Sequence, residues 1–275
     1  MLLNSFIVSI AALFLVPADN DQNSDSSPEF GHPGKFTFVR AIYDSTGGVD
    51  EAYYFFEGRM WQRWQTDFPE AEENFLKRLE ELSTIQVNLE PVALKLTDPN
   101  LFKFPFLYMC DVGWQQLDGK EEKALRDYLN RGGFLWVDDF WGDGEWQNFE
   151  INMRGVFPDL EWIDIPKTHP IYQMVFPLEE CPQIPAKSFW DAGWRETYDH
   201  PRVHRYPTGG IEGVSKINFK GLFDPNNNRL LAVATHNNDV GDGWEREGEN
   251  LEYFKTFSTK SYALGVNIIV YALTH

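Results

Sequence analysis

The feature that most constrains the fold is a strand, a helix and a second strand that follow one another with short joints. Residues 104–110 form a continuous apolar run of strand length. Asp118 then marks a helix start by capping-box spacing, and Gly132-Gly133 marks the helix end. A second apolar strand, residues 134–137, follows at once. Such a crossover joins parallel strands of a sheet buried on both faces, so the chain is predicted to form an open, doubly wound α/β sheet.

The sequence on either side of this crossover supplies further elements. Residues 36–43 alternate and are rich in β-formers, which predicts the first strand, and residues 92–96 predict a second. Between them, Asp67-Phe68-Pro69-Glu70 predicts a capped helix start. Later elements are helices at 145–156 and 259–273, a strand at 160–165, an irregular insertion at 177–213 and a hairpin at 222–231. We expect residues 35–275 to form a single domain.

The first residues of the chain resemble an export signal. A mostly apolar run at residues 6–16 is too short for a bilayer, which needs roughly 20 residues, although no Lys or Arg precedes it. Val16-Pro17-Ala18 fits a signal-peptidase site. We therefore expect residues 1–18 to be a signal peptide and residues 19–34 a disordered linker. The protein is then periplasmic or extracellular, with no stable membrane span after processing.

Charge and cysteine content exclude several functions. Acidic residues outnumber basic ones 42 to 24, a net charge of -18, which opposes binding to nucleic acid. An exported protein could join Cys110 to Cys181, but Cys110 ends an apolar run, where a buried free thiol is expected. No His-and-acid pattern accompanies either cysteine, so a catalytic thiol is not expected.

Two polar clusters follow apolar strands and are the candidate site. Asp138-Asp139 follows residues 134–137, and residues 236–239 with Asp242 follow residues 230–235. If both strands are parallel, both clusters emerge at the sheet edge where doubly wound proteins bind ligands. The candidate ligand-binding residues are Arg40, Asp138, Asp139, His236, Asn238, Asp239, Asp242 and Trp244. The candidate catalytic residues are Asp138, Asp139, His169, Asp239 and Asp242.

These residue types allow several chemistries. Asp, Asn and His could bind Ca²⁺, Mg²⁺ or Zn²⁺, but no calcium loop or i, i+4 His pair occurs, so we predict no metal site and no cofactor. Paired acids also suit glycoside hydrolysis. Adjacent Asp138 and Asp139 would point to opposite faces, so one of them facing Asp239 or Asp242 fits better. Alternatively, one of the pair caps the next helix and the other binds a base such as Arg40.

Tryptophans in loop-like stretches are a second candidate feature. They could give stacking platforms for a sugar ring, or they could simply cover the sheet edge. They are Trp61, Trp64, Trp141, Trp146, Trp190, Trp194 and Trp244.

From Phe36 to His275, several motifs together resemble those of the domain-of-unknown-function 4159 family, a group of exported or membrane-associated bacterial proteins. They are Phe38-Val39-Arg40, Asp67-Phe68-Pro69 with Glu72-Glu73-Asn74-Phe75, Phe104-Pro105-Phe106-Leu107-Tyr108, Gly132-Gly133-Phe134-Leu135 with Asp138-Asp139, His169-Pro170-Ile171-Tyr172, and Asn238-Asp239 with Gly241-Asp242-Gly243-Trp244. The resemblance implies a flavodoxin-like, class I glutamine amidotransferase-like fold, similar to ThuA-like proteins, and no particular activity.

The sequence departs from the amidotransferases at their nucleophile. Those enzymes place a Cys on a strand-to-helix elbow, whereas here Asp138-Asp139 stands there beside Phe140 and Trp141. We therefore expect no amidotransferase activity. The expected function is binding of a small polar ligand or a bacterial envelope protein partner at the strand edge. The alternative is a hydrolase of sugars or cell-wall material that uses strand-end carboxylates, with or without a metal ion.

Overall fold

The computed structural model describes residues 34–46, 52–56, 58–191 and 218–275. The predicted signal peptide, almost all of the predicted linker, Trp194 and the insertion beyond Asp191 lie outside these described residues.

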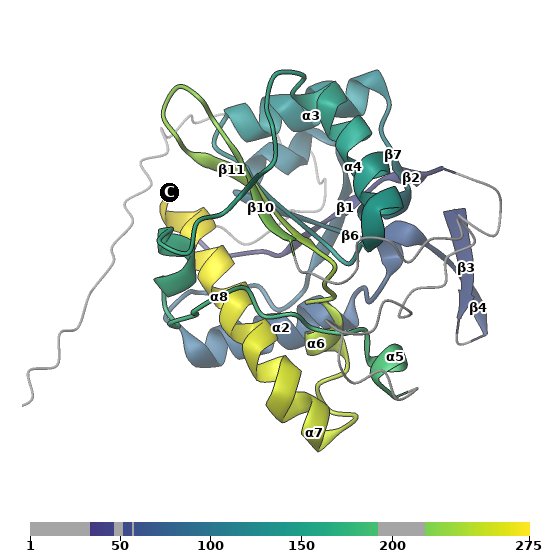
Figure 1. The fold of residues 1–275 in the computed structure, drawn as a ribbon, viewed down its shortest axis with the longest axis vertical. Helices are drawn as coiled ribbons and strands as arrows, with labels where there is room; N and C mark the ends of the chain where they lie inside the picture. The colour runs from purple at the N-terminus through teal and green to yellow at the C-terminus, as the bar shows by residue number, and fades with distance from the viewer. Residues whose placement is uncertain (1–33, 47–51, 57, 192–217) are drawn as a thin grey trace, which may run out of the picture. The chain divides into compact units, whose positions relative to one another are not determined.

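A seven-stranded, mostly parallel sheet forms the centre of the fold (Figure 1). Its strands, in spatial order, are β5 (Val92–Lys95), β1 (Val39–Ile42), β6 (Phe106–Cys110), β8 (Phe134–Asp138), β11 (Leu230–His236), β10 (Asn218–Phe223) and β9 (Ile163–Asp164). The first five run parallel, and β10 pairs antiparallel with both β11 and β9. In chain order the parallel strands take positions 2-1-3-4-5, a doubly wound order. The predicted α/β class is therefore confirmed.

Helices cover both faces of this sheet. One face carries α2 (Glu70–Leu82) and α8 (Thr259–Thr274), and the other carries α3 (Gly119–Asn130) and α4 (Gly142–Val156) (Figure 1). Side chains alternate between the two faces along each strand. In β6, for example, Phe106 and Tyr108 pack in the first core, on the side of α2 and α8, and Leu107 and Met109 pack in the second core, on the side of α3 and α4. The sheet is thus buried on both sides, which leaves its strand ends as the place for a site.

The predicted crossover is present. Asp118 caps α3 by accepting hydrogen bonds from the Lys120 and Glu121 amides, and the Glu121 carboxylate accepts a hydrogen bond from the Asp118 amide. Gly132, with φ of 105°, ends the helix in a conformation that few other residues adopt. β6 and β8 then pair in parallel over their full length.

Other predicted elements differ in extent. The strand expected at 160–165 is only two residues long, and α4 begins at Gly142 instead of residue 145 because Asn237 accepts the Gly142 amide at 2.8 Å. Asp67 does not cap α2, whose N-cap is Pro69. The hairpin of β3 (Tyr53–Phe56) and β4 (Arg59–Gln62) was not predicted.

The remaining elements are short. They are β2 (Asp44–Ser45), η1 (Arg63–Gln65), η2 (Pro99–Lys103), η3 (Val112–Trp114), β7 (Gln115–Gln116), η4 (Pro170–Gln173), α5 (Lys187–Asp191), α6 (Asp242–Glu245), α7 (Leu251–Tyr253) and the π-helix η5 (Phe254–Ser258). Cys110 and Cys181 are both buried and free, so they do not form the disulfide that export would permit. Within the described residues, no helix combines the length and apolar character needed to cross a membrane.

Candidate functional site

A pocket of about 890 Å³ lies at the carboxyl edge of the parallel strands. Doubly wound sheets bind ligands at this edge, where the strand order reverses between β1 and β6. Nine acidic side chains among the described residues line it: Asp67, Glu70, Asp111, Asp139, Asp191, Asp239, Asp242, Glu245 and Glu249. Four basic side chains line it too: Arg59, Arg63, Lys187 and Arg246. The pocket is therefore strongly acidic.

The strand ends deliver these side chains by a repeated backbone feature. Asp111 follows β6, Asp139 follows β8 and Asn237 follows β11, and all three have a positive φ, of 55°, 53° and 59°. Asp and Asn tolerate this left-handed conformation better than other non-glycine residues. Three of the five parallel strands, β6, β8 and β11, therefore end in a sharp turn at the pocket edge.

Asp138 holds the loop between β11 and α6 in place. It is fully buried and accepts hydrogen bonds from the Tyr108 hydroxyl at 2.9 Å and the Thr235 hydroxyl at 2.5 Å. It also accepts from the amides of Val240 at 2.8 Å and Gly241 at 3.0 Å. Burial raises the pKa of Asp138 to about 6, and these hydrogen bonds oppose the rise. Asp138 is thus a support for the site and not part of its surface.

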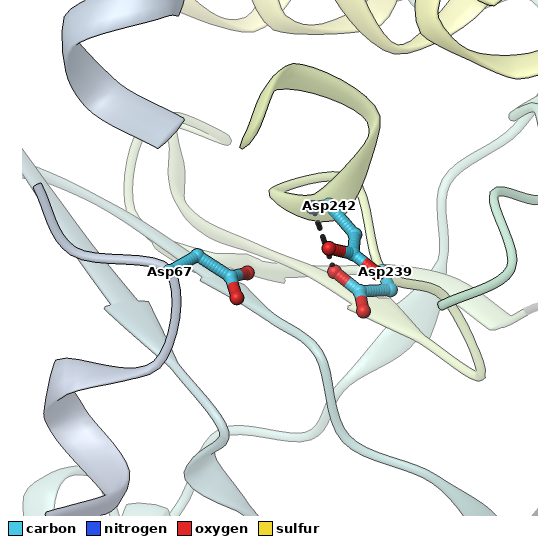
Figure 2. Close-up of side chains that lie close together, drawn as sticks. All are labelled: Asp67, Asp239 and Asp242. Carbon is cyan, nitrogen blue, oxygen red and sulfur yellow. Dashed lines mark hydrogen bonds between the residues drawn. The ribbon is translucent and has the colours of Figure 1, made fainter. Parts of the chain in front are cut away.

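Three carboxylates meet at the centre of the pocket (Figure 2). Asp67, Asp239 and Asp242 each place an oxygen within 4.8 Å of the others, a grouping that could hold a metal ion. Asp239 also accepts the Asp242 amide at 2.9 Å. Gly241 allows the close approach of the two loops, because a Cβ at this position would lie 3.0 Å from Asp67 Oδ2.

Burial and repulsion between carboxylates raise the pKa of Asp67, Asp139 and Asp239. The pKa of Asp239 is raised well above its usual value by burial and then by Asp139 and Asp242. The pKa of Asp67 is raised by burial and by Asp242, and that of Asp139 by burial, Asp111 and Asp67. A positive charge at this point would relieve the repulsion and favour the ionised carboxylates.

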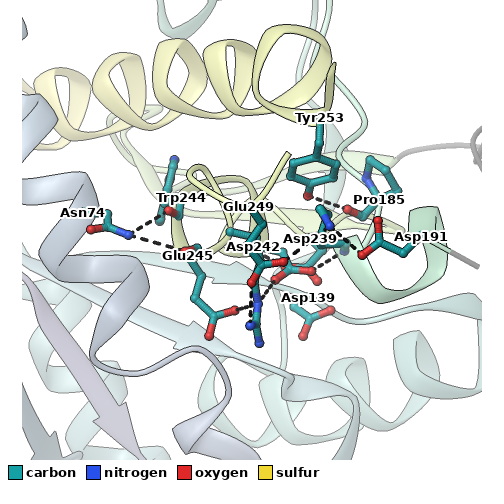
Figure 3. Close-up of polar contacts among 12 residues, drawn as sticks. Asn74, Asp139, Pro185, Asp191, Asp239, Asp242, Trp244, Glu245, Glu249 and Tyr253 are labelled. Carbon is teal, nitrogen blue, oxygen red and sulfur yellow. Dashed lines mark hydrogen bonds and ion pairs between the residues drawn. The ribbon is translucent and has the colours of Figure 1, made fainter. Parts of the chain in front are cut away.

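Three of the four basic side chains that line the pocket pair with acids at its rim, among them Asp191, Glu245 and Glu249, which Figure 3 labels. Arg246 lies 2.5 Å from Glu245 and 3.0 Å from Glu249, and Lys187 lies 2.5 Å from Asp191 and 3.4 Å from Glu249. At the other side, Arg63 bonds Asp111 at 3.0 Å. These rim acids thus have basic partners, whereas the described residues give the carboxylates of Asp67 and Asp239 none.

The β3–β4 hairpin forms an aromatic wall of the pocket. Tyr54 and Trp61 face each other across the two strands and stack, with ring centroids 6.4 Å apart and an interplanar angle of 9°. The Arg59 guanidinium lies 3.2 Å from the centre of the Trp61 ring. Phe55 points the other way and is 70% exposed. One face of the hairpin therefore serves the pocket, and the opposite face meets solvent.

Of the predicted site residues, only Asp139, Asp239 and Asp242 line the pocket. Arg40 is fully buried and binds Glu72, with 2.6 Å between Nε and Oε1, instead of Asp138 or Asp139. Neither member of that pair caps the next helix, since the N-cap of α4 is Trp141 without a side-chain bond. The expectation that one of these aspartates caps the next helix and the other binds a base such as Arg40 is therefore wrong in both parts.

The other predicted residues serve the core. His236 is buried against the Gly142 carbonyl at 3.0 Å, and burial lowers its pKa to about 4. Asn238 accepts the Ile184 amide at 2.6 Å, and Trp244 packs within the first core. His169 accepts the Ile171 amide at 3.3 Å and does not line the pocket.

The sequence alone does not place several of the pocket residues at the site. The pattern at Asp67 predicts a helix cap, and only the fold brings this residue to the pocket. Asp111, by contrast, follows an apolar strand as Asp139 does, so the strand-end rule could have found it. Among the tryptophans, Trp61 lines the pocket, whereas Trp141, Trp190 and Trp244 are buried.

The fold and the site together define a doubly wound α/β protein with an acidic pocket at the carboxyl edge of its sheet. The chain belongs to the family described as Domain of unknown function (DUF4159), which it matches over residues 57–273. This membership confirms the resemblance seen in the motifs, and the matched region contains all nine pocket acids. No curated protein matches the chain.

Proposed function

We propose that this protein binds a small polar ligand in the acidic pocket. The observation that carries the proposal is the convergence of Asp67, Asp239 and Asp242 from separate segments on one point of the pocket. The aromatic wall adds a surface on which a ring of the ligand can stack. A ligand with a positive charge or several hydrogen-bond donors, and with a ring, matches both surfaces.

A thermal-shift screen of sugars, amino sugars and small amines tests this proposal. A true ligand should raise the melting temperature of the parent protein and of Phe55→Ala, but not that of Trp61→Ala. The two substitutions lie on opposite faces of one hairpin, so the first controls for damage to that element. A shift that Trp61→Ala leaves intact would place the ligand elsewhere. The absence of any shift would favour a protein partner.

A hydrolase of sugars or cell-wall material is the second candidate. Its support is that the pocket holds several carboxylates of raised pKa: burial, followed by Asp67 and Asp242, raises the pKa of Glu245 to about 10, and a raised pKa is what a general acid requires. A protonated and an ionised carboxylate about 5 Å apart are the groups that retaining glycosidases use. Release of reducing ends from peptidoglycan would test this activity. Asp239→Asn should then lower the rate at least about 100-fold, whereas Glu70→Gln should not.

We further propose that the protein is exported and has an amidotransferase-like domain at residues 35–275. The support is the apolar run and cleavage pattern before Asp19, and the 2-1-3-4-5 strand order. Expression in a bacterium, followed by cell fractionation and amino-terminal sequencing, tests the location. Protein in the periplasm or medium that begins at Asp19 is expected, and full-length protein in the cytoplasm would contradict export.

A further inference from the structure

We infer that Asp67, Asp239 and Asp242 bind one hard divalent cation, with Ca²⁺ preferred over Mg²⁺. This inference rests on the pocket being the ligand site proposed above, and it specifies the ion that the three carboxylates bind. Asp67 comes from the loop before α2, Asp239 from the loop after β11 and Asp242 from the first position of α6, and the three side chains point toward one another (Figure 2).

The first support is that Asp67 and Asp239 have few hydrogen-bond donors, whereas Asp242 accepts the Lys187 amide at Oδ2 and pairs with Arg246 at Oδ1. Asp239 is only 4% exposed, and among the described residues it accepts one bond, at Oδ1 from the Asp242 amide, and none at Oδ2. The Asp67 carboxylate has no hydrogen bond or ion pair with the described residues, and its Oδ2 is closed to solvent. Buried carboxylate oxygens without donors are unfavourable, and a bound cation would satisfy them.

The second support is the spacing of the oxygens. Ca²⁺ binds oxygen at about 2.3 to 2.6 Å, so oxygens on opposite sides of the ion lie about 4.6 to 5.2 Å apart. For Mg²⁺, at about 2.0 to 2.1 Å, the corresponding separation is only about 4.0 to 4.2 Å. The three carboxylate atoms lie within 4.8 Å of one another, so no two of them are further apart than two ligands of one Ca²⁺ can be. Mg²⁺ demands a near-octahedral arrangement and is usually bound by only one or two carboxylates, so a site with three carboxylates favours Ca²⁺.

The third support is that no described basic side chain fills this position. Arg246 comes nearest, 3.5 Å from Asp242 Oδ1, but its guanidinium is bound more closely by Glu245 and Glu249. Ca²⁺ takes six to eight oxygen ligands, so three carboxylates leave positions for water or for ligand hydroxyls. The cation would in this way join the acidic floor of the pocket to a polar ligand.

Isothermal titration of CaCl₂ and MgCl₂ into the metal-free full-length protein tests the inference. One Ca²⁺ per chain should bind with a dissociation constant below about 1 mM, and more tightly than Mg²⁺. Asp67→Asn should weaken Ca²⁺ binding at least about tenfold. It should leave the fold intact, because Asp67 makes no side-chain bond with the described residues and Asn tolerates its positive φ. Asp239→Asn provides a second variant at the same centre.

The matched control is Glu70→Gln, which removes one charge from the same pocket without touching the three carboxylates. Its Ca²⁺ affinity should stay within about twofold of the parent value. Equal losses in Glu70→Gln and Asp67→Asn would show diffuse attraction and overturn the site, as would the absence of saturable Ca²⁺ binding. If Ca²⁺ does not bind but an amino sugar stabilises the parent and not Trp61→Ala, the cation site is overturned and the proposed ligand pocket stands. If neither binds, both proposals fail.

Discussion

Two adjacent carboxylates, Asp138 and Asp139, have different roles because the backbone changes between them. Asp138 ends β8 and points into the core, where it accepts four hydrogen bonds. Asp139 adopts a φ of 53° and reaches the pocket, where its Oδ1 accepts the Trp141 indole N–H at 2.9 Å. The alternation of a strand predicts that the two point apart, but it does not say which one reaches the ligand edge.

At the residue scale, Asp138→Asn should destabilise the protein by about 2 to 4 kcal/mol. The amide cannot accept at both ends, so at least one buried donor among Tyr108, Thr235, Val240 and Gly241 loses its partner. Urea unfolding monitored by circular dichroism measures the change. Asp164→Asn, at an acid that is 75% exposed, should change stability by less than about 0.5 kcal/mol. Equal stability of the two variants would contradict the supporting role.

A second prediction concerns Glu145, which lies at the start of α4. Burial, with a smaller contribution from Asp111, raises the pKa of this carboxyl to about 8, compared with 4.5 for an ordinary glutamate. Between these pH values the folded chain retains a proton that the unfolded chain releases, so stability falls as the pH rises through this range.

Glu145→Gln cannot ionise, and its oxygen can still accept the Trp141 amide. Between about pH 5 and pH 8 the parent should lose stability on the order of a few kcal/mol. The variant should lose less over the same pH range. Urea unfolding at the two pH values provides the comparison. The same pH dependence in parent and variant would mean that Glu145 is ionised throughout in the folded protein.

At the scale of elements, a buried ion pair fixes the loop that carries Asp67. Arg40 on β1 binds Glu72 on α2, and the same guanidinium donates to the carbonyls of Trp64 at 3.2 Å and Thr66 at 2.9 Å. Arg40 therefore links the central sheet, the first helix and the loop between them. It was expected at the ligand, but its contacts make it a positioning residue.

Arg40→Met should cost about 3 to 5 kcal/mol, because it leaves the Glu72 carboxylate buried without its partner. The double variant Arg40→Met, Glu72→Met should recover a large part of that loss, since replacing a whole buried pair by apolar groups is often close to neutral. Denaturant unfolding of both variants gives the two values. A double variant as unstable as the single one would indicate that the Trp64 and Thr66 contacts dominate.

The elements that could be predicted are those whose signals are local. The capping box at Asp118 and the glycines after residue 131 define α3 and β8 almost to the residue. The β3–β4 hairpin lacked such a signal because its apolar side chains lie on both faces: Tyr54 lines the pocket, and Phe55 meets solvent. An element that does not bury one face in the core gives no clear period in the sequence.

At the scale of the whole molecule, the sheet could be predicted but the centre of the pocket could not. The position of Asp139 and Asp239 follows from the rule that ligands lie at the carboxyl ends of parallel strands. Asp67 joins them only because α2 packs against α6, which brings a loop from the first half of the chain beside one from the last. That packing depends on long-range contacts, which no local pattern in the sequence records.

The last prediction follows from the net charge of -18 and from the concentration of acids in one pocket. Like charges repel one another in the compact state, and salt screens this repulsion: the Debye length falls from about 30 Å at 0.01 M to about 3 Å at 1 M. Raising NaCl through this range should therefore raise the melting temperature. A melting temperature that falls with NaCl would show that ion pairs, such as Arg246 with Glu245, contribute more to stability than the repulsion removes.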